Sequence, residues 1–148
     1  VPPDNLMEVA ALIDPRINYI YVPHGLKTQA LHVGVNAMDG YKYILLVDDD
    51  TQLQEDMVFD ESFFNENDKV AGVGYSRDVI DANLLTRTCK FQLKADAGHM
   101  RGGVMYALSG TTWILPGTLA LYRRDYWLDI MEDHPCTPYG EDLFTGSL

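Results

Sequence analysis

An apolar segment that runs directly into three acidic residues constrains this chain more than any other part of its sequence. Residues 41–53 read YKYILLVDDDTQL, so the β-forming run Tyr43–Val47 is followed at once by Asp48, Asp49 and Asp50. Such an apolar run followed by polar residues predicts a strand. Ligands of open α/β sheets bind outside the carboxyl ends of the strands, so the three carboxylates stand where a divalent cation can bind. Their hard oxygen atoms suit Mg²⁺ or Mn²⁺.

Two further apolar runs and the spacing between them predict the fold class. Ile17–Val22 (INYIYV) and Val70–Tyr75 (VAGVGY) are rich in β-forming residues, and we expect both to be strands. Within Lys27–Met38, the apolar side chains Leu31, Val35 and Met38 fall at positions i, i+4 and i+7, which predicts a helix. The gaps between the strands leave room for crossover helices, which favours a mostly parallel sheet flanked by helices.

The two ends of the sequence predict that the chain is a fragment. A helix is expected over Asp4–Ile13, after Pro2 and Pro3, whereas α/β domains usually begin with a central strand. The sequence also ends in GEDLFTGSL, without a Gly or Pro stop signal. We therefore expect residues 1–148 to form a single partial α/β domain that lacks its first strand.

Composition excludes several classes of function. With 47% hydrophobic residues, the 148 residues suffice for one core. The formal charge of −11 disfavours binding to nucleic acid or anionic lipid. Cys89 and Cys136 are too few for a disulfide framework, and no apolar stretch is long enough to span a bilayer. These features predict a soluble intracellular chain with no nucleic-acid partner.

Three common chemistries that use a strand followed by acidic residues each fail at a named position. A receiver domain needs a phospho-acceptor aspartate at the end of a later strand and a lysine well beyond it, but Asp96 follows the non-strand sequence QLKA and the last lysine is Lys94. Haloacid-dehalogenase-type phosphatases need Thr or Val where Gln52 stands, and a calcium-binding loop needs Gly where Leu53 stands. A solvated acidic loop that caps the next helix remains as a structural interpretation.

Taken as Asp48-x-Asp50-Thr51, the acidic segment resembles the D-x-D motif of family 2 glycosyltransferases, in particular membrane polysaccharide synthases such as chitin, hyaluronan and cellulose synthases. Three other segments resemble motifs of that family and occur in the family's order. They are GLKTQALHVGVN at 25–36, LPGTLALYRRDYW at 115–127 and GEDLFTG at 140–146. The family's first strand and its Q-x-x-R-W segment have no counterpart here.

The resemblance implies a GT-A-like fold and an inverting, metal-dependent transfer of a sugar from a UDP-sugar to a growing polysaccharide or other glycan acceptor. It implies that Asp48 and Asp50 hold Mg²⁺ or Mn²⁺, which offsets charge on the leaving diphosphate. Lys27 and Asp48 would bind the nucleotide. The parent protein would be associated with a membrane through segments absent from this chain, with its catalytic domain in the cytoplasm.

The resemblance also assigns an acceptor side to the site. Pro116, Gly117 and Glu141 would bind the acceptor, and Asp142 would be the general base that takes the proton of the attacking hydroxyl. Each position also has a purely structural interpretation, since Pro-Gly is a common turn and paired acids favour the first turn of a helix. An exposed lysine at a helix start, such as Lys27, is equally ordinary.

A second function class stays open at this point. The chain could be a noncatalytic α/β module whose acidic loop binds a divalent cation or a basic partner. A zinc site at His134-x-Cys136 is disfavoured, because two ligands without a second pair do not complete one. Binding of UDP in the presence of Mn²⁺ discriminates between the enzyme and the module.

Overall fold

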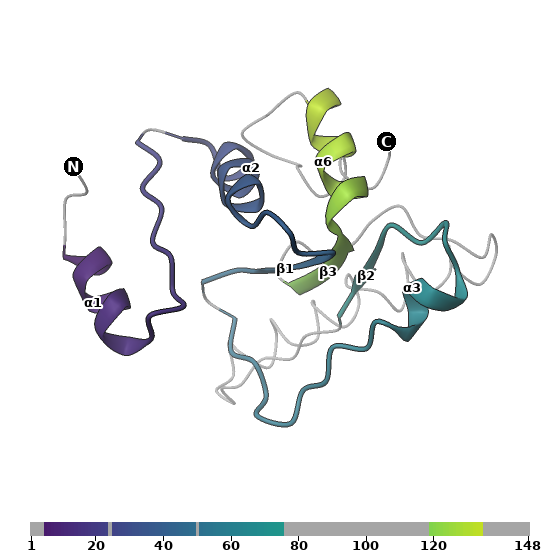
Figure 1. The fold of residues 1–148 in the computed structure, drawn as a ribbon, viewed down its shortest axis with the longest axis horizontal. Helices are drawn as coiled ribbons and strands as arrows, with labels where there is room; N and C mark the ends of the chain where they lie inside the picture. The colour runs from purple at the N-terminus through teal and green to yellow at the C-terminus, as the bar shows by residue number, and fades with distance from the viewer. Residues whose placement is uncertain (1–4, 24, 50, 76–118, 135–148) are drawn as a thin grey trace, which may run out of the picture.

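A three-stranded sheet forms the centre of the computed structural model, which describes residues 5–23, 25–49, 51–75 and 119–134 (Figure 1). The strands are β1 (Tyr43–Val47), β2 (Gly72–Gly74) and β3 (Leu119–Arg123), in the order β1-β3-β2. With the helices described below, the sheet gives a mixed α/β class, as the sequence predicted.

The expectation of a parallel sheet is wrong. β3 lies between β1 and β2 and pairs antiparallel with both of them, with Leu45 and Val73 each opposite Leu121. β1 and β2 therefore run in the same direction, but they do not pair with each other. The physical reason is the buried apolar run 119–122, which supplies a third strand that satisfies the backbone groups of both neighbours.

The predicted strand at Ile17–Val22 is also not observed. This segment runs extended beside α1 (Leu6–Ile13), away from the sheet, and the structure assigns it no strand (Figure 1). Ile17 is 45% exposed and Tyr21 is 41% exposed. A high β-propensity reflects packing on a pleated, half-buried surface, and this segment lacks such a surface within the part of the chain that is described.

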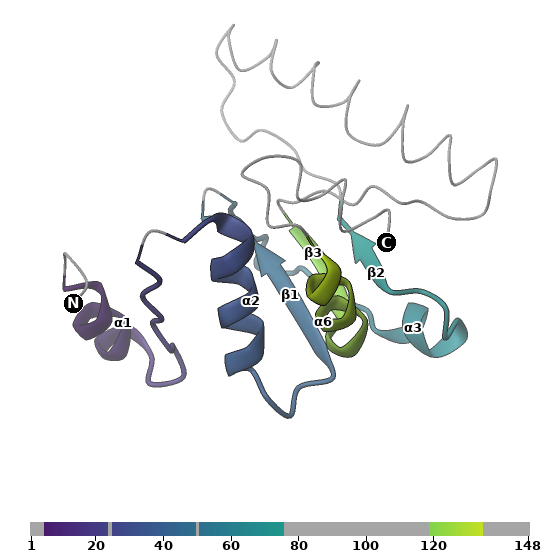
Figure 2. The same ribbon diagram turned by 90° about the horizontal axis from the view of Figure 1, so that it is seen from above.

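Two helices cover one face of the sheet, as the view from above shows (Figure 2). They are α2 (Lys27–Ala37), which confirms the helix predicted at that position, and α6 (Arg124–Asp133), which follows β3 without a break. Their apolar side chains pack on alternate residues of β1 and β3. The buried cluster consists of Val35, Ile44, Ala120, Tyr122, Trp127 and Met131.

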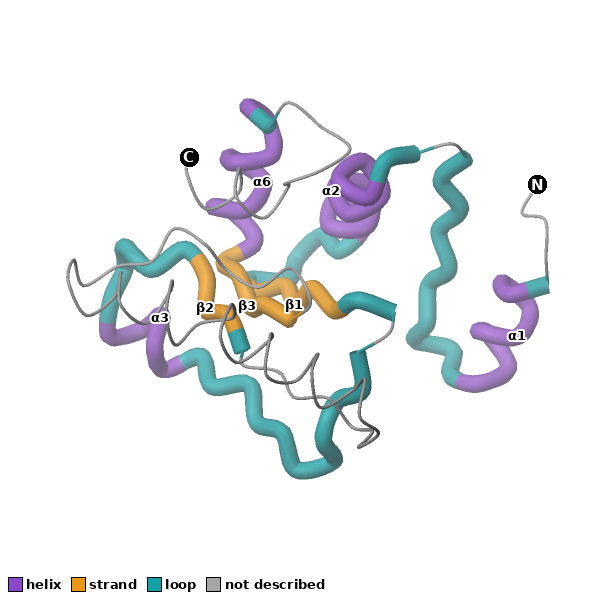
Figure 3. Tube along the Cα trace, turned by 180° about the vertical axis from the view of Figure 1, so that it is seen from behind, coloured by secondary structure: helices purple, strands orange, loops and turns teal. Residues whose placement is uncertain are grey.

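The opposite face of the sheet carries α3 (Ser62–Glu66) and the loop that precedes it (Figure 3). Phe64 is 1% exposed and stacks on Tyr43 with ring centroids 5.0 Å apart. The guanidinium of Arg123 donates hydrogen bonds to the carbonyl oxygens of Phe64, Asn67 and Val70. Arg123 thereby ties α3 and the entry to β2 onto the central strand.

The first helix contributes nothing to this core. α1 confirms the helix predicted near the start of the chain, but none of its residues is buried. Leu12 is 86% exposed and Ile13 is 72% exposed. Across the described ranges, no helix combines the length and the apolar character needed to cross a membrane.

Candidate functional site

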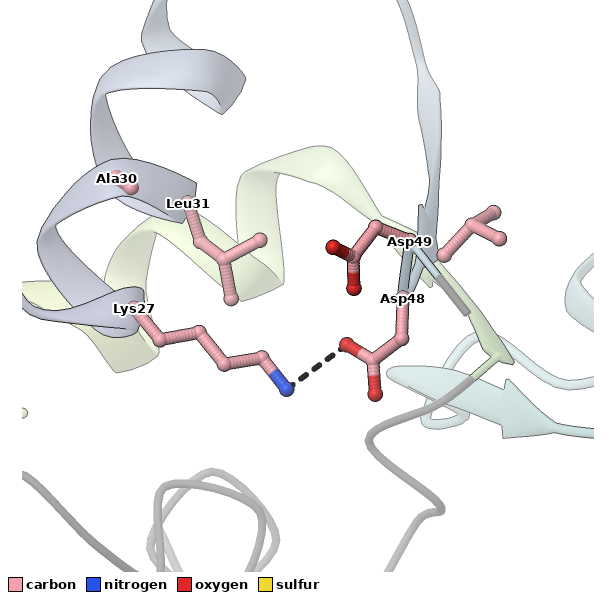
Figure 4. Close-up of a pocket in the computed structure, with 6 residues that line it drawn as sticks. Lys27, Ala30, Leu31, Asp48 and Asp49 are labelled. Atoms are coloured by element: carbon pink, nitrogen blue, oxygen red, sulfur yellow. Dashed lines mark ion pairs between the residues drawn. The ribbon is translucent and has the colours of Figure 1, made fainter. Parts of the chain in front are cut away.

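An open pocket of about 500 Å³ lies where the amino-terminal end of α2 meets the carboxyl end of β1 (Figure 4). Two of the residues predicted to act together, Lys27 and Asp48, lie on opposite walls of this pocket. The full lining consists of Lys27, Ala30, Leu31, Val47, Asp48 and Asp49. The pocket is therefore lined by three charged side chains and by the apolar side chains of Ala30, Leu31 and Val47.

A tight turn positions the start of α2. A Cβ atom on Gly25 would lie 2.6 Å from Cγ1 of Val22, so glycine allows the chain to pass this side chain closely. The side chain of Gln29 then turns back, and its Oε1 accepts the backbone N–H of Leu26 at 3.2 Å. This bond satisfies one of the backbone donors at the helix start and sets the point from which Lys27 projects.

The other end of α2 is held by Arg124, at the junction of β3 and α6. Its Nε donates to the carbonyl oxygen of Val35 at 3.3 Å, and its Nη2 lies 3.7 Å from Oδ1 of Asp39. Its backbone N–H donates to the carbonyl of Lys42 at 3.0 Å. Because these contacts join α2, β1 and β3, they fix the helix along the strand, with Lys27 beside the end of β1.

The acidic wall is built by the residues that leave β1. Ile44 is buried under α2, and this anchors the strand whose end carries Asp48. The backbone N–H of Thr51 donates to the carbonyl of Asp48 at 3.0 Å, which turns the chain sharply after the strand. In Figure 4 the carboxylates of Asp48 and Asp49 both point toward α2.

The two walls are joined by an ion pair. Nζ of Lys27 lies 2.9 Å from Oδ1 of Asp48, which is the distance of a charge-assisted hydrogen bond. The lysine side chain is 46% exposed and that of Asp48 is 26% exposed. Exposed pairs of this kind contribute only about 0–1 kcal/mol, so the two groups can change partners at little cost.

The described carboxylates fit a hard divalent cation. Asp48 and Asp49 offer oxygen ligands, and Mg²⁺ sites commonly use one or two carboxylates together with waters and substrate phosphates. Among the residues with described positions, no group of three or more His, Cys, Asp or Glu side chains is close enough to hold a metal ion. The predicted ligand Asp50 lies outside the described residues, so its part in the site stays a prediction.

The acceptor side of the predicted site lies outside the described residues as well. This applies to Pro116, Gly117, Glu141 and Asp142, whose roles stay predictions. Cys136 also lies outside the described residues. His134, at the end of α6, is 6% exposed and belongs to the interior.

The structure adds to the pocket two residues to which the family resemblance gave no role. Asp49, the middle residue of the D-x-D pattern, lines the pocket because the chain turns at this point. Leu31, identified from the sequence only as part of an apolar helix stripe, contributes to the apolar wall. Comparison of the chain with protein-family models, with curated proteins and with solved structures gives no match.

Proposed function

We propose that the chain is part of an inverting, metal-dependent glycosyltransferase that transfers a sugar from a UDP-sugar to a growing polysaccharide or other glycan. The observation that carries the proposal is the meeting of Lys27 and Asp48 across one pocket. The two residues come from separate segments of the sequence, and the family resemblance assigns both to the same diphosphate site. Two residues that bind one metal–diphosphate unit have to line a common pocket, and Lys27 and Asp48 meet this requirement.

The charges of the pocket suit a nucleotide diphosphate bound with a cation. Lys27 offers an ammonium to the phosphate oxygens, and the dipole of α2, which begins at this residue, favours negative charge at the same end. Asp48 and Asp49, together with Asp50, would hold Mg²⁺ or Mn²⁺. When bound, the cation stabilises the negative charge that develops on the leaving diphosphate.

The remaining parts of the proposal come from the sequence resemblance alone. Asp142 would accept the proton of the attacking hydroxyl, and Pro116, Gly117 and Glu141 would bind the acceptor sugar. A GT-A-like domain in a membrane-associated parent protein belongs to the same proposal. The antiparallel sheet order differs from the parallel sheet that we expected for such a domain, so the support comes from the pocket and not from the sheet.

Calorimetric titration of the 148-residue chain with UDP tests the proposal. We expect saturable UDP binding that requires Mn²⁺, and weaker binding of UMP, which lacks the second phosphate. Asp48→Asn should weaken UDP binding by about tenfold or more, equivalent to about 1.4 kcal/mol. Asp129→Asn, an equal change of charge on the exposed face of α6, should leave the affinity unchanged.

The same titration includes an outcome that favours the noncatalytic module. Suppose that Mn²⁺ binding depends on Asp48 but UDP does not bind, or binds no better than UMP. This result would contradict the transferase. It would support a cation-binding module instead.

A further inference from the structure

The ion pair in the pocket occupies the groups that a donor complex would need. Oδ1 of Asp48 is engaged by Nζ of Lys27 at 2.9 Å. In the proposed function the carboxylate faces a cation, and the ammonium faces a phosphate. Cation and phosphate therefore compete electrostatically with the ion-pair partner for these two groups, and the partial exposure of both side chains allows the pair to separate.

The charges around the pocket explain why such a pair would be useful. Three consecutive aspartates in a chain with a formal charge of −11 attract any divalent cation in solution. Of the described residues that line the pocket, Lys27 is the one cation. Its ammonium neutralises the nearest carboxylate and repels an approaching divalent ion at short range.

We infer that Lys27 is an internal counter-ion that keeps the acidic site from binding a free divalent cation until a phosphate-bearing ligand binds the ammonium. The inference rests on the proposed function, because it assigns the exchange to the same pocket. It makes the binding of cation and nucleotide diphosphate cooperative, since each ligand weakens the ion pair and so makes the charge of the other member more available to the second ligand. By linkage, UDP raises the affinity for Mn²⁺ by the same factor by which Mn²⁺ raises the affinity for UDP.

The test is the affinity for Mn²⁺ in the absence of nucleotide, measured from the electron paramagnetic resonance signal of free Mn²⁺. Lys27→Met removes the charge and keeps much of the side-chain length, so it should bind Mn²⁺ about three- to tenfold more tightly than the wild type, the range expected for a nearby charge in partly screened solvent. Lys27→Arg keeps the charge and should bind Mn²⁺ as the wild type does. Lys69→Met is the matched control, because it makes the same charge change in the turn before β2, away from the pocket.

A second titration with UDP present measures the cooperativity. In Lys27→Met, UDP should raise the affinity for Mn²⁺ by a smaller factor than in the wild type, and UDP itself should bind more weakly. In Lys27→Met the affinity for Mn²⁺ alone should rise while the affinity for UDP falls. Unfolding would lower both affinities, and circular dichroism of each variant verifies the fold.

The outcomes distinguish the inference from the proposed function. Equal Mn²⁺ affinity in Lys27→Met and the wild type, with intact Mn²⁺-dependent UDP binding, overturns the counter-ion and leaves the transferase standing. Tighter Mn²⁺ binding in Lys27→Met, in a chain that never binds UDP, supports the counter-ion and contradicts the transferase. Tighter Mn²⁺ binding in Lys69→Met as well would show a general charge effect and overturn the counter-ion.

Discussion

Removal of the Arg123 guanidinium should destabilise the sheet strongly, because this one side chain holds three backbone carbonyls. It donates to Val70 at 2.9 Å, to Asn67 at 3.2 Å and to Phe64, and its guanidinium carbon lies 5.4 Å from the centre of the Phe64 ring. A hydrogen bond from a charged donor contributes about 1.5–3 kcal/mol. These carbonyls are only partly buried and water can replace some of the bonds, so we expect Arg123→Met to cost about 2–4 kcal/mol in total.

Urea denaturation measures this loss through tryptophan fluorescence, with Trp113→Phe in the reference chain and in each variant so that the signal comes from Trp127, which is 2% exposed in the core. With an m-value of about 1–3 kcal/mol per molar urea, the midpoint should fall by roughly 1–2 M. Arg16→Met is the control: its guanidinium is exposed and bonds only to the neighbouring Asp14 among the described contacts, so the midpoint should hardly move. An unchanged midpoint in Arg123→Met would refute the assignment of Arg123 as the tie between α3 and β3.

Three further predictions concern two glycines and the pH dependence of stability. A Cβ on Gly34, within α2, would meet no atom within 4 Å, so Gly34→Ala should raise the free energy of unfolding by about 0.5–1 kcal/mol. Gly40 has φ +84°, a backbone conformation that alanine rarely adopts, so Gly40→Ala should lower the free energy of unfolding by about 1 kcal/mol. Thermal melts show whether each variant is more or less stable than the wild type, and a stabilising effect of Gly40→Ala would contradict the positive φ at this residue. Burial and the charge of Asp60 raise the pKa of Tyr75 above its ordinary value of 10.0. As the pH rises, this phenol therefore ionises in the unfolded chain at a lower pH than in the folded chain. The free energy of unfolding is constant with respect to this group below about pH 10 and falls as the pH rises toward the pKa of the folded state. Urea midpoints at rising pH should fall less in Tyr75→Phe than in the wild type, and identical profiles would contradict this origin.

The elements that the sequence predicted well are those with a strong local pattern. The apolar spacing within α2 and the run Tyr43–Val47 define a helix and a strand without reference to distant residues. Ile17–Val22 has a similar composition but makes no strand, because strand formation depends on a pairing partner that the local sequence does not encode. Local pattern therefore predicted these elements, while long-range pairing decided which of them joined the sheet.

The position of β3 was the main feature that the sequence analysis missed. Leu119, Ala120, Leu121 and Tyr122 are all buried, and a continuous apolar run is typical of a central strand covered on both faces. The run was interpreted only through its resemblance to an acceptor motif. Its apolar continuity was the signal that could have identified a central strand.

For the site, the sequence predicted the residue types on both walls of the pocket but not the contact between them. Lys27 and Asp48 were identified from separate motifs, and their ion pair depends on the way Arg124 fixes α2 along β1. Asp49 was one of the three acidic residues expected near a cation, but the D-x-D pattern assigns its middle residue no role of its own. The turn after β1 brings that carboxylate to the pocket, and a motif alone does not contain this turn.

The central claim is that a metal-bound nucleotide diphosphate binds between the start of α2 and the end of β1. Nuclear magnetic resonance of the ¹⁵N-labelled chain with Mn²⁺ and UDP tests it directly, because bound Mn²⁺ broadens the amide signals of nearby residues; Mg²⁺ and UDP provide the diamagnetic control. We predict that the signals of Lys27, Asp48 and Asp49 disappear with Mn²⁺ and UDP, while those of α1 and α3 persist. Persistent signals at these three residues, or broadening centred on α1 or α3, would contradict the claim.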